Sequence, residues 1–282
     1  MRVEVNLLSL RNIRISLNYN YYLSSLIYKI VGAYSKKFAR KLHSGGFSFG
    51  GKIFKAFTFS KIFYFDGAHV EDGKIFIPEN SEISFLVSSP YEEFVKNFAL
   101  GLTKIDKIWL GEKNNIFELK SVEVIFEPDV FDGDLMEIIE MRGVFISPLV
   151  VSKVDSLGRK IYLGCLDADV PELVKENLFK KFLAFYKYTP EDHFEFTFLM
   201  DYVMKHDWRK LITIKEGTPE ETKVKGMLAP FLIKGTRRML KFAWEIGLGE
   251  RNSMGFGMWD IKRDKVNGTG ENSKTKESGY GS

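Results

Sequence analysis

The sequence predicts an α+β protein of two tandem ferredoxin-like (βαββαβ) domains, with a basic cleft and a C-terminal glycine-rich loop. Three observations lead to this prediction. Strand-like and helix-like stretches follow one another as β-α-β-β-α-β in the first half, and the second half repeats that order loosely. Positive charge is concentrated in two separate blocks of the chain. A helix-like segment near the end of the chain leads into a stretch with paired glycines at both ends.

The first half begins with a half-buried strand, in which Val3, Val5 and Leu7 alternate with polar residues. An apolar stripe at helical spacing predicts a helix over residues 21–33, and residues 35–43 add a further helical stretch that ends at Gly45-Gly46. The remaining expected elements are a strand at 52–65, a hairpin-like pair at 74–77 and 82–87, a helix capped by Ser88 or Ser89, and strand character at Trp109 and 117–126.

The second half is expected to contain strands at 143–151, 160–166, 194–202, 211–215, 223–233 and 256–261, with helices at 171–186 and 236–246. Pro128, Gly133 and several acidic residues mark a boundary between Glu127 and Glu140. We therefore expect an N-terminal domain at 1–130, a C-terminal domain at 140–263 and a disordered polar tail at 264–282.

The net charge of +4 conceals an uneven distribution along the 282 residues. Residues 1–65 carry eleven Lys or Arg and one acidic residue, residues 66–204 have a net charge of −12, and residues 205–251 have a net charge of +5. If the two basic blocks meet in space, they form a cleft that suits a polyanion. An ordinary solvated surface is the better explanation for the second block alone, whereas a polyanion partner is the better explanation for the first.

Several classes of protein are disfavoured. The single cysteine, Cys165, cannot form an intramolecular disulfide and fits a reducing, cytoplasmic setting. No stretch has the pattern of a signal peptide or the length of a membrane span. His69, His193 and His206 are scattered without metal-ligand spacing, so we expect no metal site.

The glycine-rich loop, residues 247–257, has glycines at 247, 249, 255 and 257 and one basic residue, Arg251. Glycine lets a backbone approach a phosphate closely, so such a loop can lie against a nucleic-acid strand. The loop follows a helix and precedes a strand, which is the reverse of a dinucleotide fingerprint, and it lacks the Gly-Lys-Ser/Thr of a P-loop. A plain connecting turn remains the alternative.

Tyr28, His43 and Lys55 fall in the basic, nearly acid-free first block. Each has an ordinary explanation by itself, as surface tyrosine, helix-ending histidine or surface lysine. Together they match what metal-free RNA cleavage needs: a base for the 2′-hydroxyl, an acid for the leaving 5′-oxygen, and a cation for the phosphorane. Lys52, close by, is the reserve for the lysine role.

Residues 21–28 (Tyr-Tyr-Leu-Ser-Ser-Leu-Ile-Tyr), Leu42-His43, the Phe-Thr-Phe-Ser of 57–60 and the glycine-rich loop resemble the CRISPR repeat-processing endoribonucleases of the RAMP superfamily. The resemblance covers roughly residues 1–262. It implies two ferredoxin-like domains and metal-independent, cofactor-free cleavage of CRISPR repeat RNA, leaving a 5′-hydroxyl and a 2′,3′-cyclic phosphate. By position, Tyr28, His43 and Lys55 match the tyrosine, histidine and lysine of archaeal members.

The same resemblance implies RNA contacts from two surfaces. One is a lysine-bearing strand pair, and the other surrounds the glycine-rich loop: Lys223, Lys225 and Lys234, then Arg237, Arg238, Gly247, Gly249, Arg251, Gly255 and Gly257. Expected partners are CRISPR repeat RNA and no membrane. A homodimer and a hand-over of product to a CRISPR effector complex stay open.

Two rival interpretations remain at this point. A catalytically inactive RNA-binding subunit of a CRISPR ribonucleoprotein would share the fold and the loop, but it would not need His43. An unrelated basic protein with a chance glycine loop would bind repeat RNA no better than any other polyanion.

Overall fold

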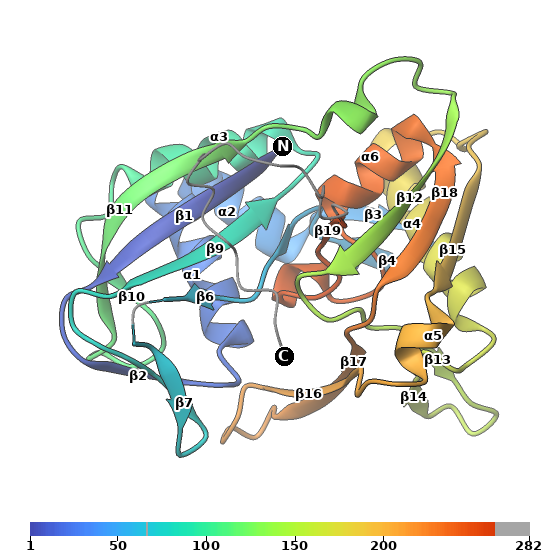
Figure 1. The fold of residues 1–282 in the computed structure, drawn as a ribbon. Coiled ribbons are helices and arrows are strands. Elements are labelled where there is room, and N and C mark those ends of the chain that lie inside the picture. Colours follow the sequence, from blue (N-terminus) through green and yellow to red (C-terminus); the bar gives the residue numbers. More distant parts are fainter. Residues whose placement is uncertain (66, 263–282) are drawn as a thin grey trace, which may run out of the picture.

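The computed structural model describes residues 1–65 and 67–262. Two antiparallel sheets lie side by side, one in each half of the chain (Figure 1). The tail that was predicted to be disordered, 264–282, lies outside the described residues. Among the described residues, no helix is both long enough and apolar enough to cross a bilayer.

The first half contains a ferredoxin-like sheet with additional strands. Its sheet order is β10-β11-β1-β9-β5, and β6 also pairs with β9. The helices α1 and α3 pack against each other, and their apolar residues share one core with the sheet. The elements are β1 (Arg2–Ser9), β2 (Ile13–Ser16), α1 (Asn20–Tyr34), α2 (Lys36–Ser44), β3 (Phe47–Phe49), β4 (Lys52–Phe54), β5 (Thr58–Phe59), β6 (Phe63–Tyr64), β7 (His69–Glu71), β8 (Lys74–Ile77), β9 (Glu82–Ser88), α3 (Glu92–Leu102), β10 (Ile108–Trp109) and β11 (Ile116–Ile125).

The second half has a four-stranded sheet in the order β15-β18-β12-β19, which is the ferredoxin-like order for strands that appear in sequence as β12, β15, β18 and β19. Two hairpins, β13–β14 and β16–β17, are added to it. The elements are η1 (Asp129–Phe131), β12 (Ile138–Phe145), β13 (Ser152–Val154), β14 (Lys160–Tyr162), α4 (Val170–Tyr186), β15 (Phe194–Phe198), α5 (Met200–Val203), β16 (Arg209–Ile214), β17 (Thr222–Met227), β18 (Phe231–Thr236), α6 (Arg237–Ile246), η2 (Asn252–Met254) and β19 (Trp259–Ile261).

Local sequence explains where the helices near the site begin. The Ser35 side chain accepts a hydrogen bond from the Phe38 amide and caps α2, and Thr236 caps α6 through the Met239 amide. Pro171 occupies the first turn of α4, where its missing N–H costs no helical hydrogen bond. The expected helices at 21–33, 35–43, 171–186 and 236–246 are thus confirmed with small shifts at their ends.

Strand pairing differs from the expectation in three places. The strand expected at 52–65 is divided into β4, β5 and β6, and Ala56, between β4 and β5, adopts the left-handed conformation with φ 55°. The expected hairpin at 74–77 and 82–87 does not form: β8 pairs with β2 and β7, while β9 pairs with β1. The strand expected at 223–233 divides into β17 and β18, which belong to different sheets and are separated by the stretch that contains Pro230.

Other boundaries also shift. The helix expected after a Ser88 or Ser89 cap begins only at Glu92, and the Ser89 hydroxyl instead accepts a hydrogen bond from the Tyr91 amide. The strands expected at 160–166 and 194–202 end early, at Tyr162 and Phe198. The strand expected at 143–151 is displaced: it begins at Ile138, inside the expected domain boundary, and ends at Phe145.

Arg2 joins the two halves. Its fully buried guanidinium lies over the Trp244 ring, 3.7 Å from the ring centroid, and donates hydrogen bonds to the backbone carbonyls of Trp244 (3.0 Å) and Trp259 (2.9 Å). The first strand of the chain is therefore tied to α6 and to the last strand.

Candidate active site

Tyr28 lies at the edge of the first core, on α1, with its ring half-buried. Its ring meets the His43 ring edge-on at a centroid distance of 5.3 Å, and it meets the Phe57 ring in the same way at 5.5 Å. Burial raises the pKa of the Tyr28 phenol to about 12, and a hydrogen bond with the Ser253 side chain partly offsets that rise. The hydroxyl thus stays protonated at physiological pH.

His43 stands in the last turn of α2 with an exposed side chain. Its backbone carbonyl accepts a hydrogen bond of 2.5 Å from the Lys55 ammonium. Burial lowers the pKa of Lys55 below its ordinary value. The structure therefore brings Tyr28, His43 and Lys55 together from three separate elements or connections.

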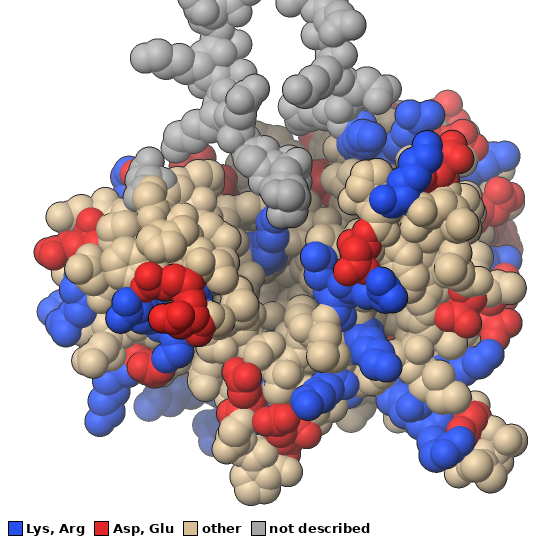
Figure 2. Space-filling view, turned by 60° about the horizontal axis from the view of Figure 1, so that its bottom comes forward, with Lys and Arg blue, Asp and Glu red and all other residues tan. Residues whose placement is uncertain are grey.

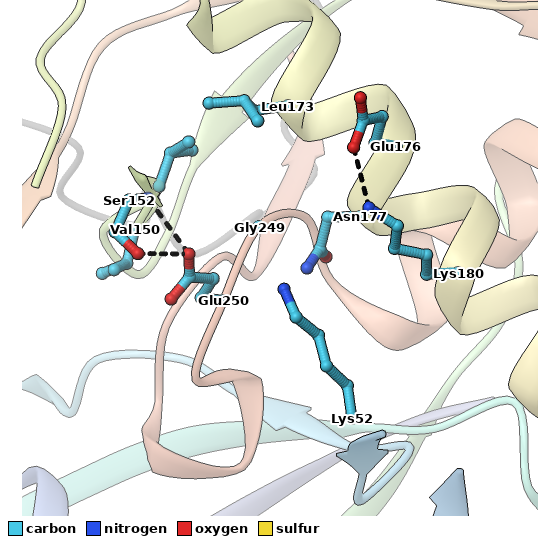
Figure 3. A pocket seen from close by; sticks show the side chains of 10 residues that line it. Lys52, Val150, Ser152, Leu173, Glu176, Asn177, Lys180, Gly249 and Glu250 are labelled. Carbon is cyan, nitrogen blue, oxygen red and sulfur yellow. Dashed lines mark hydrogen bonds and ion pairs between the residues drawn. The ribbon is translucent and has the colours of Figure 1, made fainter. Parts of the chain in front are cut away.

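Lys52, the reserve lysine, is exposed at the start of β4 and extends in another direction. Figure 3 shows its side chain extending from the β3–β4 hairpin toward Asn177 of α4 and toward the glycine-rich loop at Gly249. Lys55 rather than Lys52 is thus the lysine beside His43.

The four glycines of the glycine-rich loop are buried, and each has a positive φ, between 64° and 81°. A Cβ on Gly255 would lie 2.3 Å from Phe59 Cε2, and one on Gly257 would lie 1.8 Å from the Leu248 carbonyl oxygen. A Cβ on Gly249 would lie 2.5 Å from the Val150 carbonyl oxygen. Close packing within the protein therefore requires these glycines, whatever the loop binds.

Helix α1 holds the loop from the side of the first half. The Asn20 amide donates to the carbonyl oxygens of Met254 (3.0 Å) and Gly255 (3.2 Å), and the Ser24 hydroxyl donates to the Ser253 carbonyl (2.7 Å). Because Tyr28 is one helical turn beyond Ser24, this clamp sets Ser253 beside the tyrosine hydroxyl.

A groove with a volume of about 620 Å³ borders this arrangement. It lies between the segment 52–57, the β13–β14 hairpin, α4 and the glycine-rich loop. Its charged lining residues are six basic ones and one acidic one: Lys52, Lys55, Lys153, Lys160, Lys181 and Arg251, with Glu250. Three of these lysines come from the acidic middle of the chain, so the groove is not simply a meeting of the two basic blocks.

The negative charge of the Glu250 carboxylate is already balanced by its neighbours. It accepts hydrogen bonds from the Ser152 amide (3.0 Å), the Ser152 hydroxyl (2.6 Å) and the Lys160 ammonium (2.8 Å), two of which join Ser152 and Glu250 in Figure 3. Burial acts to raise the Glu250 pKa, but these hydrogen bonds outweigh it and the pKa is lowered. The groove is therefore electropositive.

The outward turn of the loop leaves backbone donors available. Within residues 1–65 and 67–262, the amides of Arg251, Asn252 and Ser253 have no hydrogen-bond acceptor, and these residues line the groove. Arg251 adopts the left-handed conformation with φ 59° just before a 3₁₀ turn, which points successive amides in one direction. Such amides can donate hydrogen bonds to phosphate oxygens.

Arg237 does not fit the expected RNA contact and has a structural role. It is 8% exposed, and its guanidinium donates to the carbonyl oxygens of Val130 (2.6 Å), Asp132 and Asp134 (3.1 Å) and to the carboxylate of Glu137. The sequence could not reveal this role, because the carbonyls belong to a connection about a hundred residues earlier.

Arg238 is also engaged, in an ion pair of 2.7 Å with the fully buried carboxylate of Asp192. Both arginines lie at the N-terminal end of α6, whereas Gly247 follows its C-terminal end. A helix of 10 residues separates these ends by about 15 Å, so the two arginines do not flank the loop in space.

The predicted lysines are in different settings. Lys223 and Lys225 are exposed on one face of β17, whose hairpin lies at the bottom of the molecule in Figure 1. Figure 2 turns that side forward and shows Lys and Arg gathered on the second half, beside a hollow between the halves. Lys234 is half-buried in β18, in register with Glu140 and Glu195 on the neighbouring strands, so acidic residues flank it.

The sequence reasoning overlooked Ser253 and Lys181. Ser253 was inside the recognised loop but had no assigned role. Lys181 lies on the buried face of α4 with Val170, Val174, Leu178 and Phe182, so the apolar periodicity could have revealed it as a lysine in a core position. Among the described residues, no three His, Cys, Asp or Glu side chains form a group that could hold a metal ion.

Comparison with known families covers most of the chain. The family described as "CRISPR-associated protein Cas6, N-terminal" matches residues 14–122, and "CRISPR associated protein Cas6, C-terminal" matches residues 135–261. The chain is 28% identical over 278 residues to "CRISPR-associated endoribonuclease Cas6 1" of Methanocaldococcus jannaschii, which covers 94% of each protein.

Another relative is "Putative CRISPR-associated endoribonuclease-like protein Cas6" of Pyrococcus furiosus, 27% identical with 93% of this chain and 98% of the relative covered. A solved structure entitled "CRISPR associated protein Cas6" superposes with a TM-score of 0.70 at 27% identity, covering 93% of this chain and 99% of the other. The α+β fold of two ferredoxin-like domains agrees with these matches. The chain belongs to the Cas6 family of CRISPR-associated proteins.

Proposed function

We propose that this protein cuts CRISPR repeat RNA by a metal-independent transesterification. The observation that carries the proposal is the convergence of Tyr28, His43 and Lys55 beside the electropositive groove. Endoribonuclease is also the activity in the name of the M. jannaschii relative, which matches nearly the whole chain.

In the proposed reaction, the 2′-hydroxyl loses its proton to a base, and its oxygen forms a bond to the adjacent phosphorus. The bond from phosphorus to the 5′-oxygen breaks, and an acid gives that oxygen a proton. The products are a 2′,3′-cyclic phosphate and a 5′-hydroxyl. The RNA supplies the nucleophile, so the protein has only to position it and move protons.

Tyr28 suits the donor role in this scheme, because a phenol with a pKa of about 12 retains its proton at neutral pH. His43 is exposed, adjoins the Tyr28 ring and therefore suits the complementary role of proton acceptor. Lys55, whose ammonium is already directed toward the end of α2, would stabilise the negative charge of the phosphorane.

RNA binding would use the groove and the exposed lysines of β17. The amides of residues 251–253 and the Arg251 side chain would meet the backbone near the scissile phosphate, and Lys223 and Lys225 would contact phosphates farther away. We no longer expect phosphate contacts from Arg237, and the four buried glycines would act by shaping the loop. A homodimer and transfer of the product to an effector complex stay open predictions.

The test is cleavage of end-labelled repeat RNA from the host's CRISPR array in excess EDTA. We expect one cut, a cyclic phosphate on the upstream fragment by mass spectrometry, and no cut in RNA with a 2′-deoxy substitution at that position. Cleavage of the 2′-deoxy RNA, or a requirement for added metal ion, would overturn the mechanism.

A second candidate function is RNA binding without cleavage. The observation that favours it is the sequence identity of 27% to the P. furiosus relative whose name contains "putative" and "endoribonuclease-like", which is close to the 28% identity to the M. jannaschii relative. Tight binding of repeat RNA with no product in a single-turnover assay would support this alternative.

A further inference from the structure

Lys181 is a lysine in a core position. It lies on α4, its side chain is 2% exposed, and its ammonium donates hydrogen bonds to the carbonyl oxygens of Gly247 (2.8 Å) and Gly249 (2.7 Å). A buried cation is costly unless it is well solvated by the protein, and these two carbonyls provide that solvation.

The charged groups around Lys181 offer it no strong counter-charge. Of the described residues that line the same groove, only Glu250 on the loop is acidic, and it already binds Ser152 and Lys160. The hairpins contribute Lys52, Lys153 and Lys160, and α6 contributes only the apolar Ile246. Burial therefore lowers the Lys181 pKa to about 7, although the Glu250 charge acts in the opposite direction.

The two carbonyls that Lys181 holds precede the part of the loop that faces the groove. Gly247 follows α6 directly, and Gly249 is two residues before Arg251. Asn252, itself in the loop, holds the two sides of the loop together: its side-chain amide donates to the carbonyl oxygens of Leu248 (3.0 Å) and Phe256 (2.9 Å). With these carbonyls turned inward, the amides of residues 251–253 are left to face the groove.

We propose that Lys181 is a positioning residue for RNA binding: its ammonium fixes the glycine-rich loop, and RNA bound in the groove stabilises the ammonium in return. This inference rests on the proposed function, because it assumes that the groove binds the RNA backbone. It gives α4 a part in recognition without direct contact between Lys181 and RNA.

The coupling has a definite sign. Charge-assisted hydrogen bonds are roughly twice as strong as neutral ones, so the neutral amine holds the carbonyls less firmly. Phosphates in the groove favour the charged form, so RNA binding takes up a proton. Affinity is consequently highest where Lys181 is already charged, and it falls as the pH rises above neutrality.

The experiment measures the dissociation constant for the host's CRISPR repeat RNA between pH 6 and 9 at constant ionic strength. All proteins carry His43→Ala, so that no RNA is cut during the measurement. With Lys181 intact, we expect binding to weaken by about threefold to tenfold across this range. Lys181→Met should bind weakly with little pH dependence, and Lys181→Arg should bind with little pH dependence because arginine does not titrate.

Lys175→Met is the matched control, because Lys175 is a partly exposed lysine on the same helix, is paired with Glu172, and lines no part of the groove. It should retain the full pH dependence. If Lys181→Met fails to fold, calorimetry in buffers of different ionisation enthalpy on the protein with Lys181 intact replaces it. We expect net proton uptake on RNA binding at pH 7.5.

Binding with unchanged pH dependence in both Lys181 variants, or zero proton uptake when Lys181 is intact, would overturn this inference while leaving the proposed function in place. If none of the proteins bound repeat RNA at any pH, the proposed function itself would fail, and the inference with it.

Discussion

Asn20 and Gly255, 235 residues apart in the chain, are joined by a hydrogen bond of 3.2 Å from the asparagine side chain to the glycine carbonyl. This bond links the first residue of α1 to the end of the glycine-rich loop. Since α1 also carries Tyr28, the loop and the candidate catalytic tyrosine share one rigid support.

Gly255→Ala should lower the free energy of unfolding. The new Cβ would lie 2.3 Å from Phe59 Cε2 and 2.8 Å from the Asn20 amide nitrogen, and φ is +78°. We expect a loss of about 2–4 kcal/mol in urea denaturation, from overpacking together with the left-handed backbone. Gly158→Ala is the control: φ is +77° but nothing lies within 4 Å of its Cβ, so only the backbone contribution of about 1 kcal/mol should remain. Equal losses at the two positions would contradict the packing argument.

His43→Ala should lower the single-turnover cleavage rate at saturating RNA by about 10²–10⁴-fold, because it removes a proton-transfer group. Affinity should change little, since the side chain is exposed and the carbonyl that binds Lys55 remains. His69→Ala, which changes another exposed histidine on β7, should leave both quantities unchanged. A parallel loss of rate and affinity in His43→Ala would indicate a binding role.

Tyr28→Phe should keep the ring contacts with His43 and Phe57 and remove only the hydroxyl. The free energy of unfolding should change by about 1 kcal/mol or less, the net value of one hydrogen bond. The cleavage rate should nevertheless fall by at least about tenfold if the hydroxyl donates a proton. An unchanged single-turnover rate would remove Tyr28 from the mechanism.

Lys225→Gln should weaken RNA binding about equally for all sequences and reduce the slope of log affinity against log salt by about 0.7–0.9. Arg237→Gln serves as a contrast, because it leaves the carbonyls of Val130, Asp132 and Asp134 without their donor. It should destabilise the protein by about 2–5 kcal/mol without changing the salt slope. A reduced slope in folded Arg237→Gln would restore that arginine to the RNA interface.

The stability of the protein should depend on pH through Lys181. Its pKa is about 7 in the folded protein against an ordinary value of 10.5, so the unfolded chain holds more protons between these values. Stability relative to Lys181→Met should therefore rise with pH across this window, by about 1.4 kcal/mol per pH unit, and be constant below pH 7. Urea denaturation at pH 7, 8 and 9 tests this, with no such trend expected when Lys175→Met is compared with the wild type.

Periodicity in the sequence predicted what is local. Helix α4, expected at 171–186, spans Val170–Tyr186, because its apolar stripe and its proline act within a few turns. Pairing between strands that are distant in the sequence could not be predicted. The residues of β8 and β9 do not indicate that β8 pairs with β2 and that β9 pairs with β1. Two adjacent strands were therefore wrongly read as a hairpin.

The same limit applied to the site. The order of motifs singled out Tyr28, His43 and Lys55, which the structure brings together, but their chemical roles stay predictions. For Arg237, charge and nearness in sequence to the loop suggested an RNA contact, whereas burial and four acceptors on a distant connection give it a structural role. A side chain's charge does not reveal whether water or protein will surround it.

Arg2 has a consequence for synthesis on the ribosome. Its guanidinium is buried against Trp244 and the carbonyl of Trp259, both near the end of the chain. The N-terminal half can therefore collapse early, but its first strand must carry an uncovered cation until the last strand has left the exit tunnel. Until then, this cation should oppose burial of that end of β1 against another nascent copy.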